Sequence, residues 1–191
     1  MNILAVDTAT DACSVALFYQ GAIFTKSYIA PRKHIELLKP TVVALLNEAG
    51  CSLKDIEGLA LTIGPGSFAG LRIACGFIQG LGMGLELPVM PISTLEALAW
   101  PIWQDETAET ITSLVVMDAK MGEVYWGLYE REKHPPYDLN PLIPPCVSSP
   151  EGLVKNLTTY IEEKAFSRKE PTKALVGKLI GVGDGFLAYP S

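Results

Sequence analysis

Two acidic residues stand at the ends of buried apolar strands, where a carboxylate could position a metal-bound phosphate. Asp7 is the last residue of the apolar run 2–7 and is followed by Thr8 and Thr10. Asp118 is the last residue of a second apolar run. In a strand–turn–strand unit, backbone N–H groups and threonine hydroxyls can face phosphate oxygens, while the aspartate positions Mg²⁺ or water. We therefore take Asp7, Thr8, Thr10 and Asp118 as candidate nucleotide-binding residues. The alternative for Asp7 is a carboxylate that caps a tight turn.

The turn after Asp118 is poor in glycine. It reads Ala119-Lys120-Met121-Gly122, whereas close approach of a backbone to an anion favours glycine. The sequence therefore argues against robust ATP hydrolysis. We expect no required cofactor and at most weak binding of ATP or ADP.

Two glycine turns elsewhere could contact a nucleotide: the first could bind an anion, and the second, with Gly183, could lie along an adenine or ribose. Gly64, Gly66 and Ser67 precede an apolar helix, whose first N–H groups have no partner within the helix and can bind an anion. This turn lacks the lysine of a Walker loop, so it is not a P-loop. Gly183 lies in a second turn, "GVGDG". The alternative for both is an ordinary chain reversal.

The apolar helix after Ser67 contains regularly spaced glycines. Gly76, Gly80 and Gly84 recur every fourth residue and so lie along one strip of the helix. Each costs about 1 kcal/mol relative to alanine, and a smooth strip lets another helix approach closely. Because the segment is apolar nearly all round, we expect one face on the protein's own sheet and the other on a partner. The alternative is packing on the protein's own sheet alone.

Composition excludes several other functions. The net charge of −6 disfavours autonomous nucleic-acid binding, and a short basic stretch is interpreted as a solvated loop: Lys164, Arg168, Lys169, Lys173 and Lys178. His34 and His134 form no pair at zinc-ligand spacing, so we expect no metal site. The sequence contains no Gly-x-Ser-x-Gly elbow, so a hydrolase is poorly supported.

The cysteines and the hydrophobic segments favour a cytoplasmic protein. None of the four cysteines forms a Cys-x-x-Cys pair, and we expect reduced, buried thiols. Asp7 interrupts the N-terminus, which argues against a signal peptide. The uncharged run 73–85 is shorter than the ~20 residues of a membrane span, so we expect no membrane partner.

Hydrophobic periodicity predicts an α/β first half. A helix should place Ile35, Leu38 and Val42 on one buried face, end at Gly50, and kink or restart at Pro40. A further helix should begin in a capping box at Ser93. The predicted strands are 2–7, 12–21, 22–29, 56–63 and 88–92, with a helix over 66–85.

The second half begins as the first does. Residues 115–130 align with residues 4–19 at a constant offset of 111, which brings Asp118 onto Asp7. A proline-rich connector (134–145), a helix from Ser149-Pro150 and a strand near 178–185 should follow. We predict an N-terminal lobe over 1–105 and a C-terminal lobe over 106–191, the latter without its closing segment.

Four stretches in order resemble the bacterial TsaB (YeaZ) family: residues 3–18, 64–81, 91–99 and 117–129. The resemblance implies an actin-like ATPase (ribonuclease H-like) fold, with two duplicated lobes that each hold a mixed sheet flanked by helices. It also implies an accessory, non-catalytic role in making threonylcarbamoyladenosine in tRNAs that read codons beginning with A. The alternatives are a weak ATPase or sugar-kinase-like phosphotransferase and, on the naming of relatives, a peptidase.

The resemblance further implies partners and an interface. The partners would be a TsaD-like paralogue, a TsaE-like ATPase and a second copy, with tRNA reached only through the complex. Leu38 stands where TsaD-like proteins have the second metal histidine, and Ala69 stands where the family often has threonine. The candidate interface residues on the N-terminal helices are His34, Leu37, Arg72, Ile73, Gly76, Phe77, Gly80, Leu81 and Gly84.

Overall fold

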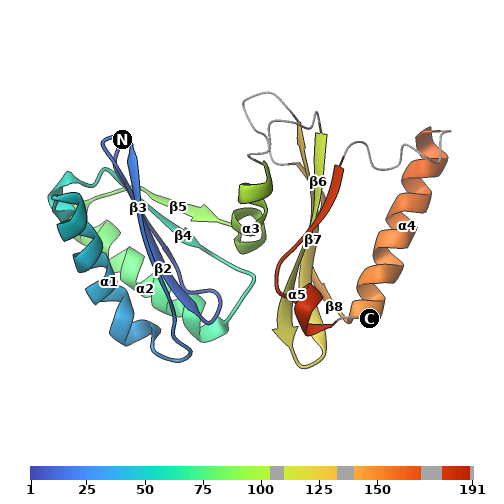
Figure 1. The fold of residues 1–191 in the computed structure, drawn as a ribbon, viewed down its shortest axis with the longest axis horizontal. Coiled ribbons are helices and arrows are strands. Elements are labelled where there is room, and N and C mark those ends of the chain that lie inside the picture. The colour runs from blue at the N-terminus through green and yellow to red at the C-terminus, as the bar shows by residue number, and fades with distance from the viewer. Residues whose placement is uncertain (104–109, 133–139, 169–177, 190–191) are drawn as a thin grey trace. The chain divides into compact units, whose positions relative to one another are not determined.

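The computed structural model divides into two compact units, Met1–Thr94 and Leu95–Ser191 (Figure 1). It describes residues 1–103, 110–132, 140–168 and 178–189. Lys164 and Arg168, predicted in a basic loop, lie instead in the helix Pro150–Arg168. Residues 169–177 of that stretch, together with His134, lie outside the described residues.

The first lobe is a five-stranded mixed sheet with both of its long helices on one face (Figure 1). The strand order is β3-β2-β1-β4-β5; β1 is antiparallel to β2 and parallel to β4, and β4 is parallel to β5. The elements, close to those predicted, are β1 (Ile3–Asp7), β2 (Ala12–Tyr19), β3 (Ala22–Ile29), α1 (His34–Ala49), η1 (Leu53–Asp55), β4 (Gly58–Thr62), α2 (Phe68–Leu85) and β5 (Val89–Ile92).

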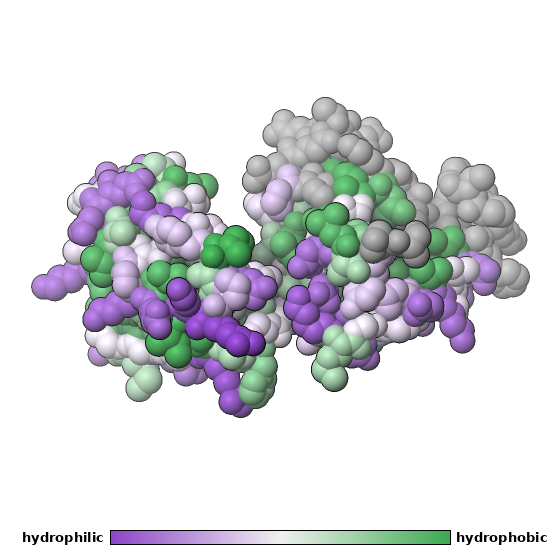
Figure 2. Space-filling model, turned by 60° about the horizontal axis from the view of Figure 1, so that its bottom comes forward, coloured by the Kyte–Doolittle hydropathy of each residue, from purple (hydrophilic) through white to green (hydrophobic). Residues whose placement is uncertain are grey.

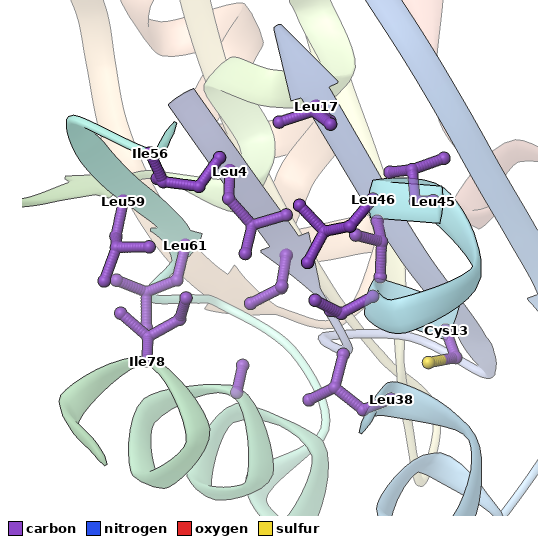
Figure 3. Close-up of a cluster of buried hydrophobic side chains, with 14 residues drawn as sticks. Leu4, Cys13, Leu17, Leu38, Leu45, Leu46, Ile56, Leu59, Leu61 and Ile78 are labelled. Carbon is purple, nitrogen blue, oxygen red and sulfur yellow. The ribbon is translucent and has the colours of Figure 1, made fainter. Parts of the chain in front are cut away.

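Alternate residues of the central strands form the first core beneath α1 and α2. Leu4, Leu17 and Leu59 are almost fully buried there, with Leu45 from α1 and Ile78 from α2 (Figure 3). Strand alternation places the leucines of the strands on one face of the sheet. The predicted helical face is confirmed at Leu38 and Val42, which are buried in the same core.

Helix α1 differs from the prediction at its N-terminal end. Ile35, expected in the core, is 76% exposed, whereas His34 is buried. The helix continues through Pro40 without a restart, and Gly50 ends it in the predicted left-handed conformation (φ 67°). Helix α3 (Thr94–Trp103) begins as predicted, but Ser93 Oγ is buried without a hydrogen-bond partner among the described residues, so the capping box is not formed.

The second lobe holds a four-stranded mixed sheet in the order β8-β7-β6-β9. One face packs against α3 through Leu95 and Ala99, and the other packs against α4 through Leu153. Because α3 packs on β6, the lobes divide after Thr94 rather than at the predicted residue 105. The elements after α3 are β6 (Thr110–Lys120), β7 (Glu123–Glu132), β8 (Asn140–Ser148), α4 (Pro150–Arg168), β9 (Lys178–Val182) and α5 (Gly185–Ala188).

The two sheets show that the lobes are duplicated. β8-β7-β6-β9 repeats β3-β2-β1-β4, with an antiparallel hairpin and then a parallel strand beside its first member. This is the predicted actin-like (ribonuclease H-like) α/β architecture. Strand β8 was predicted as a connector because of Pro141, Pro144 and Pro145; it lies at the sheet edge, where proline is tolerated.

Candidate functional site

The carboxylate of Asp7 is held in place at the end of β1. Its Oδ1 accepts hydrogen bonds from Thr62 Oγ1 on β4 (2.5 Å) and from the Ala9 backbone N–H (2.8 Å). The burial of Cys13 raises the pKa of its thiol, and the charge of nearby Asp7 raises it further. Asp7 is thus a carboxyl group held by two hydrogen bonds, beside a thiol whose pKa is raised.

The threonines after Asp7 are used within the lobe. Thr8 is fully buried, and its hydroxyl donates to the carbonyl of Gly70 in the first turn of α2 (2.7 Å). Thr10 Oγ1 accepts from the Ala12 N–H (3.1 Å) and closes the β1–β2 turn. Thr8 is therefore a structural residue, whereas Asp7 and Thr10 are only partly buried.

The glycine turn before α2 packs directly on the β1–β2 turn. The Ser67 N–H donates to the Ala9 carbonyl (2.6 Å), and Ser67 Oγ caps the helix by accepting from the Gly70 N–H (3.3 Å). A Cβ at Gly66 would overlap the Ala9 carbonyl oxygen, and one at Gly70 would overlap that of Thr8. This packing accounts for the glycines at both positions without a phosphate.

Gly64 belongs to the same turn and accepts the Thr94 N–H at its carbonyl (2.9 Å). The second lobe repeats the arrangement with Gly183, whose φ is 108° and whose Cβ would overlap the Val116 carbonyl oxygen. In each lobe, the glycine turn before a helix thus packs against the central part of the sheet. The turn before α2 packs on the β1–β2 turn, and Gly183, before α5, packs on β6.

Asp118 is not the counterpart of Asp7. Asp7 pairs with Ser14 and Leu4 with Leu17, but Asp118 pairs with Val124 and Leu114 with Leu128. Strand β7 keeps the offset of 111 from β2, since Leu17 and Leu128 face equivalent cores. Relative to these partners, β6 is therefore shifted by one residue from the position that the same offset from β1 would give. Because side chains alternate along a strand, this shift turns Asp118 toward the opposite face of its sheet.

Asp118 makes its contacts within the second lobe. Oδ2 lies 2.8 Å from Lys120 Nζ, Oδ1 accepts the Lys120 N–H (2.8 Å), and Tyr189 Oη approaches Oδ1 at 3.5 Å. The hydrogen bonds from Lys120 lower the pKa of Asp118 below its ordinary value. The Asp118 N–H donates to Asp184 Oδ1 (3.0 Å) and ties β6 to the turn before α5.

The glycine strip of α2 (Gly76, Gly80 and Gly84) faces away from the lobe. A Cβ at any of the three would meet no atom of the described residues within 4 Å, whereas one at Gly82 would lie 3.1 Å from Val89 Cγ2. Ala74 and Ile78 form the buried face of the helix. Ile73, Phe77 and Leu81 flank the strip and are partly buried against the core. Packing on the protein's own sheet therefore explains Gly82 but not the strip.

Two of the predicted interface residues lie on α1, where the structure corrects one of them. His34 is 5% exposed and cannot offer its side chain to a partner in this conformation, while Leu37 is partly buried against the core. The exposed apolar residues around the two helices are Ile35, Val43, Phe68 and Met83. Phe68 was not predicted, although its place at the start of an apolar helix was visible in the sequence. Figure 2 shows such apolar surface (green) among hydrophilic residues on the first lobe.

Three properties bear on the other functions considered. Among the described residues, no group of three or more His, Cys, Asp or Glu side chains could hold a metal ion. Cys13 is buried as predicted, but Cys51, Cys75 and Cys146 are partly exposed free thiols. Helix α2 has the length and composition of a membrane span, with 22% of it buried.

Comparison with known proteins agrees with this architecture. A family model described as "TsaD: tRNA N6-adenosine threonylcarbamoyltransferase" matches residues 25–184. The tRNA threonylcarbamoyladenosine biosynthesis protein TsaB of Escherichia coli (strain K12) is 38% identical over 190 residues, which span 100% of this chain and 74% of that protein. The protein of the same name from Haemophilus influenzae is 41% identical over 133 residues, 70% of this chain and 56% of that protein.

Solved structures give the same result. The structure titled "YeaZ from Pseudomonas aeruginosa" is 38% identical, with a TM-score of 0.70 over 78% of this chain and 68% of that one. Another structure from Pseudomonas aeruginosa, 39% identical with a TM-score of 0.70 over 78% of this chain and 67% of that one, is described as similar to "peptidase YEAZ".

Proposed function

Because this chain belongs to the TsaB family, we propose that it serves the biosynthesis of threonylcarbamoyladenosine in tRNAs that read codons beginning with A. In this proposal it is a non-catalytic subunit that binds and activates a TsaD-like threonylcarbamoyltransferase. It acts in the cytoplasm, and it reaches tRNA only through the complex, in keeping with its net charge of −6.

The observation that carries the proposal is the open glycine strip of α2. Three glycines stand in open space on one helix face, and each costs about 1 kcal/mol relative to alanine in a helix interior. Their cost is offset when a second helix packs closely against the strip. Arg72, Ile73, Phe77 and Leu81 border this surface, so a partner would contact both the backbone and the apolar side chains.

The choice of partner follows from the family. The match to the TsaD family model covers α1 and α2, so a TsaD-like paralogue would carry helices of the same kind. A second copy of this chain could use the same strip, and a TsaE-like ATPase would join the assembled complex.

The direct test is co-purification with a TsaD-like protein, followed by a threonylcarbamoylation assay with and without this chain. Gly80→Leu would place a bulky side chain on the strip, and we expect it to abolish complex formation and activation with unchanged circular dichroism. Gly80→Ala is the matched control and should retain measurable binding. An intact complex with folded Gly80→Leu would contradict the interface, and unchanged TsaD activity without the chain would contradict the function.

A nucleotide-dependent activity is the second candidate, because Asp7 is held rigidly by Thr62 and Ala9. It predicts Mg²⁺-dependent ATP turnover by the isolated chain that is lost in Asp7→Ala. Asp118 contributes no second ligand in this scheme, because Lys120 already pairs with it. Turnover no greater than that of buffer would remove this candidate.

A further inference from the structure

The N-terminal end of the glycine strip holds an aromatic residue and a cation in contact. Phe68, the first residue of α2, is 70% exposed. The guanidinium of Arg72, one turn later, lies 3.8 Å from the centre of its ring. This cation–π contact holds the ring and the guanidinium together on one exposed face of the helix.

Arg72 is the only charged residue in the eighteen residues of α2. Within the described part of the chain, no carboxylate lies within ion-pair distance of its guanidinium. A cation that loses water in an apolar interface needs an opposite charge, because an unpaired buried charge is strongly unfavourable. Any helix that covers the strip as far as its N-terminal end must therefore bring a carboxylate.

We propose that Phe68 and Arg72 determine which partner binds: a heterologous chain that offers a carboxylate to Arg72 beside an apolar pocket for Phe68. This inference rests on the proposed function and names the chemistry that the TsaD-like partner must present. Aromatic and arginine side chains in such pockets often supply most of the binding energy of an interface.

A second copy of this chain matches that description poorly. Its α2 carries no acid, and Glu48 of α1 already pairs with Lys26. Glu36 in the first turn of α1 and Glu86 at the end of α2 are the remaining acids on these helices. Self-association through the strip should therefore gain little from Arg72, whereas binding to the heterologous partner should depend on it.

The test compares two affinities for the same variants. We expect Arg72→Glu to weaken binding to the TsaD-like protein by about 30-fold or more, and Phe68→Ala by about 10-fold or more. Arg72→Lys should keep most of the affinity. Lys155→Glu, the same charge reversal on an exposed residue of α4, should change nothing. Self-association, measured by sedimentation, should stay within about 3-fold for Arg72→Glu.

The outcomes separate this inference from the proposed function. If the wild-type chain does not bind the TsaD-like protein, the proposed function fails and the inference fails with it. If Gly80→Leu abolishes binding but Arg72→Glu does not weaken it, the function stands and the inference is wrong. If Arg72→Glu weakens self-association by clearly more than about 3-fold, and Glu36→Gln or Glu86→Gln weakens it as well, a second copy supplies the carboxylate, which also overturns the inference.

Discussion

The two lobes build the same hairpin beside the same parallel strand, but they use its aspartate differently. In the first lobe, Asp7 is hydrogen-bonded by a threonine on the neighbouring strand. In the second, Asp118 lies one register step away and pairs with Lys120 in its own turn. A shift of one residue reverses the face of the sheet on which a side chain lies. Equal sequence positions in a duplicated fold are therefore weak evidence for equal roles.

What the lobes share is the glycine contact, and breaking it should have the largest effect. Gly70→Ala and Gly183→Ala each place a Cβ against a backbone carbonyl that cannot move away cheaply. We expect each to destabilise its lobe by about 3 kcal/mol or more, and Gly183→Ala adds strain because its φ is 108°. Hydrogen exchange resolved by lobe would measure the free energies of local unfolding.

Gly76→Ala is the matched control for Gly70→Ala, since both change a glycine of α2 to alanine. At position 76 the Cβ enters open space, so better helix propensity should stabilise the first lobe by up to about 1 kcal/mol. If Gly70→Ala and Gly76→Ala change stability equally, the contact between α2 and Thr8 is not what requires glycine at position 70.

The second prediction concerns the hydrogen bond that distinguishes the first lobe. Thr62→Val removes the hydroxyl that donates to Asp7 but keeps the shape of the side chain. Because hydrogen bonds to charged groups are among the stronger ones, we expect the free energy of unfolding of the first lobe, measured in urea, to fall by about 1–2 kcal/mol. The comparison variant is Tyr189→Phe, which removes the longer 3.5 Å contact to Asp118. An equal or larger loss in Tyr189→Phe would contradict the difference between the lobes.

The sequence predicted the architecture well because it depends on patterns that are local. The helical spacing of Leu38 and Val42 and Gly50 as a helix stop are confirmed, and the first strands lie close to their predicted bounds. The register of β6 against β7 depends on pairing across the hairpin and on a bulge after Asp118, which an ungapped alignment does not detect. The exchange of His34 and Ile35 between core and surface also depends on how α1 begins, where periodicity is least informative.

The contacts around the candidate site could not be predicted from the sequence, because they are not local along the chain. Residue types make Asp7 a candidate, but the burial of Thr8 and the close approach at Gly66 and Gly70 arise from the packing of two distant turns. Glycine-rich turns look alike whether they accommodate a phosphate or a neighbouring carbonyl. Three-dimensional contacts assign these two glycines to packing, whereas a Cβ added at Gly76 or Gly80 would touch nothing in the part of the chain that the structure describes.

The smallest predicted effect is the pH dependence that Asp118 gives the second lobe. Its folded-state pKa lies below the ordinary value of 3.8 because Lys120 hydrogen-bonds the carboxylate. Its contribution to stability should therefore be fully present above about pH 4 and lost as the pH falls through the folded-state pKa. Lys120 is 72% exposed, so solvent screens the pair and the contribution should be smaller than that of Thr62.

Asp118→Asn tests this dependence, because it removes the titrating group and keeps one acceptor oxygen. Unfolding of the second lobe in wild type and Asp118→Asn should differ slightly at pH 7 and converge as the pH falls through the folded-state pKa. The first lobe should show the same pH profile in both proteins, since Asp118 makes its observed contacts within the second lobe. A difference that persisted after protonation would mean that Asp118 acts through shape rather than charge. The register shift would then matter for packing alone, and Lys120 would not be the feature that sets the second hairpin apart.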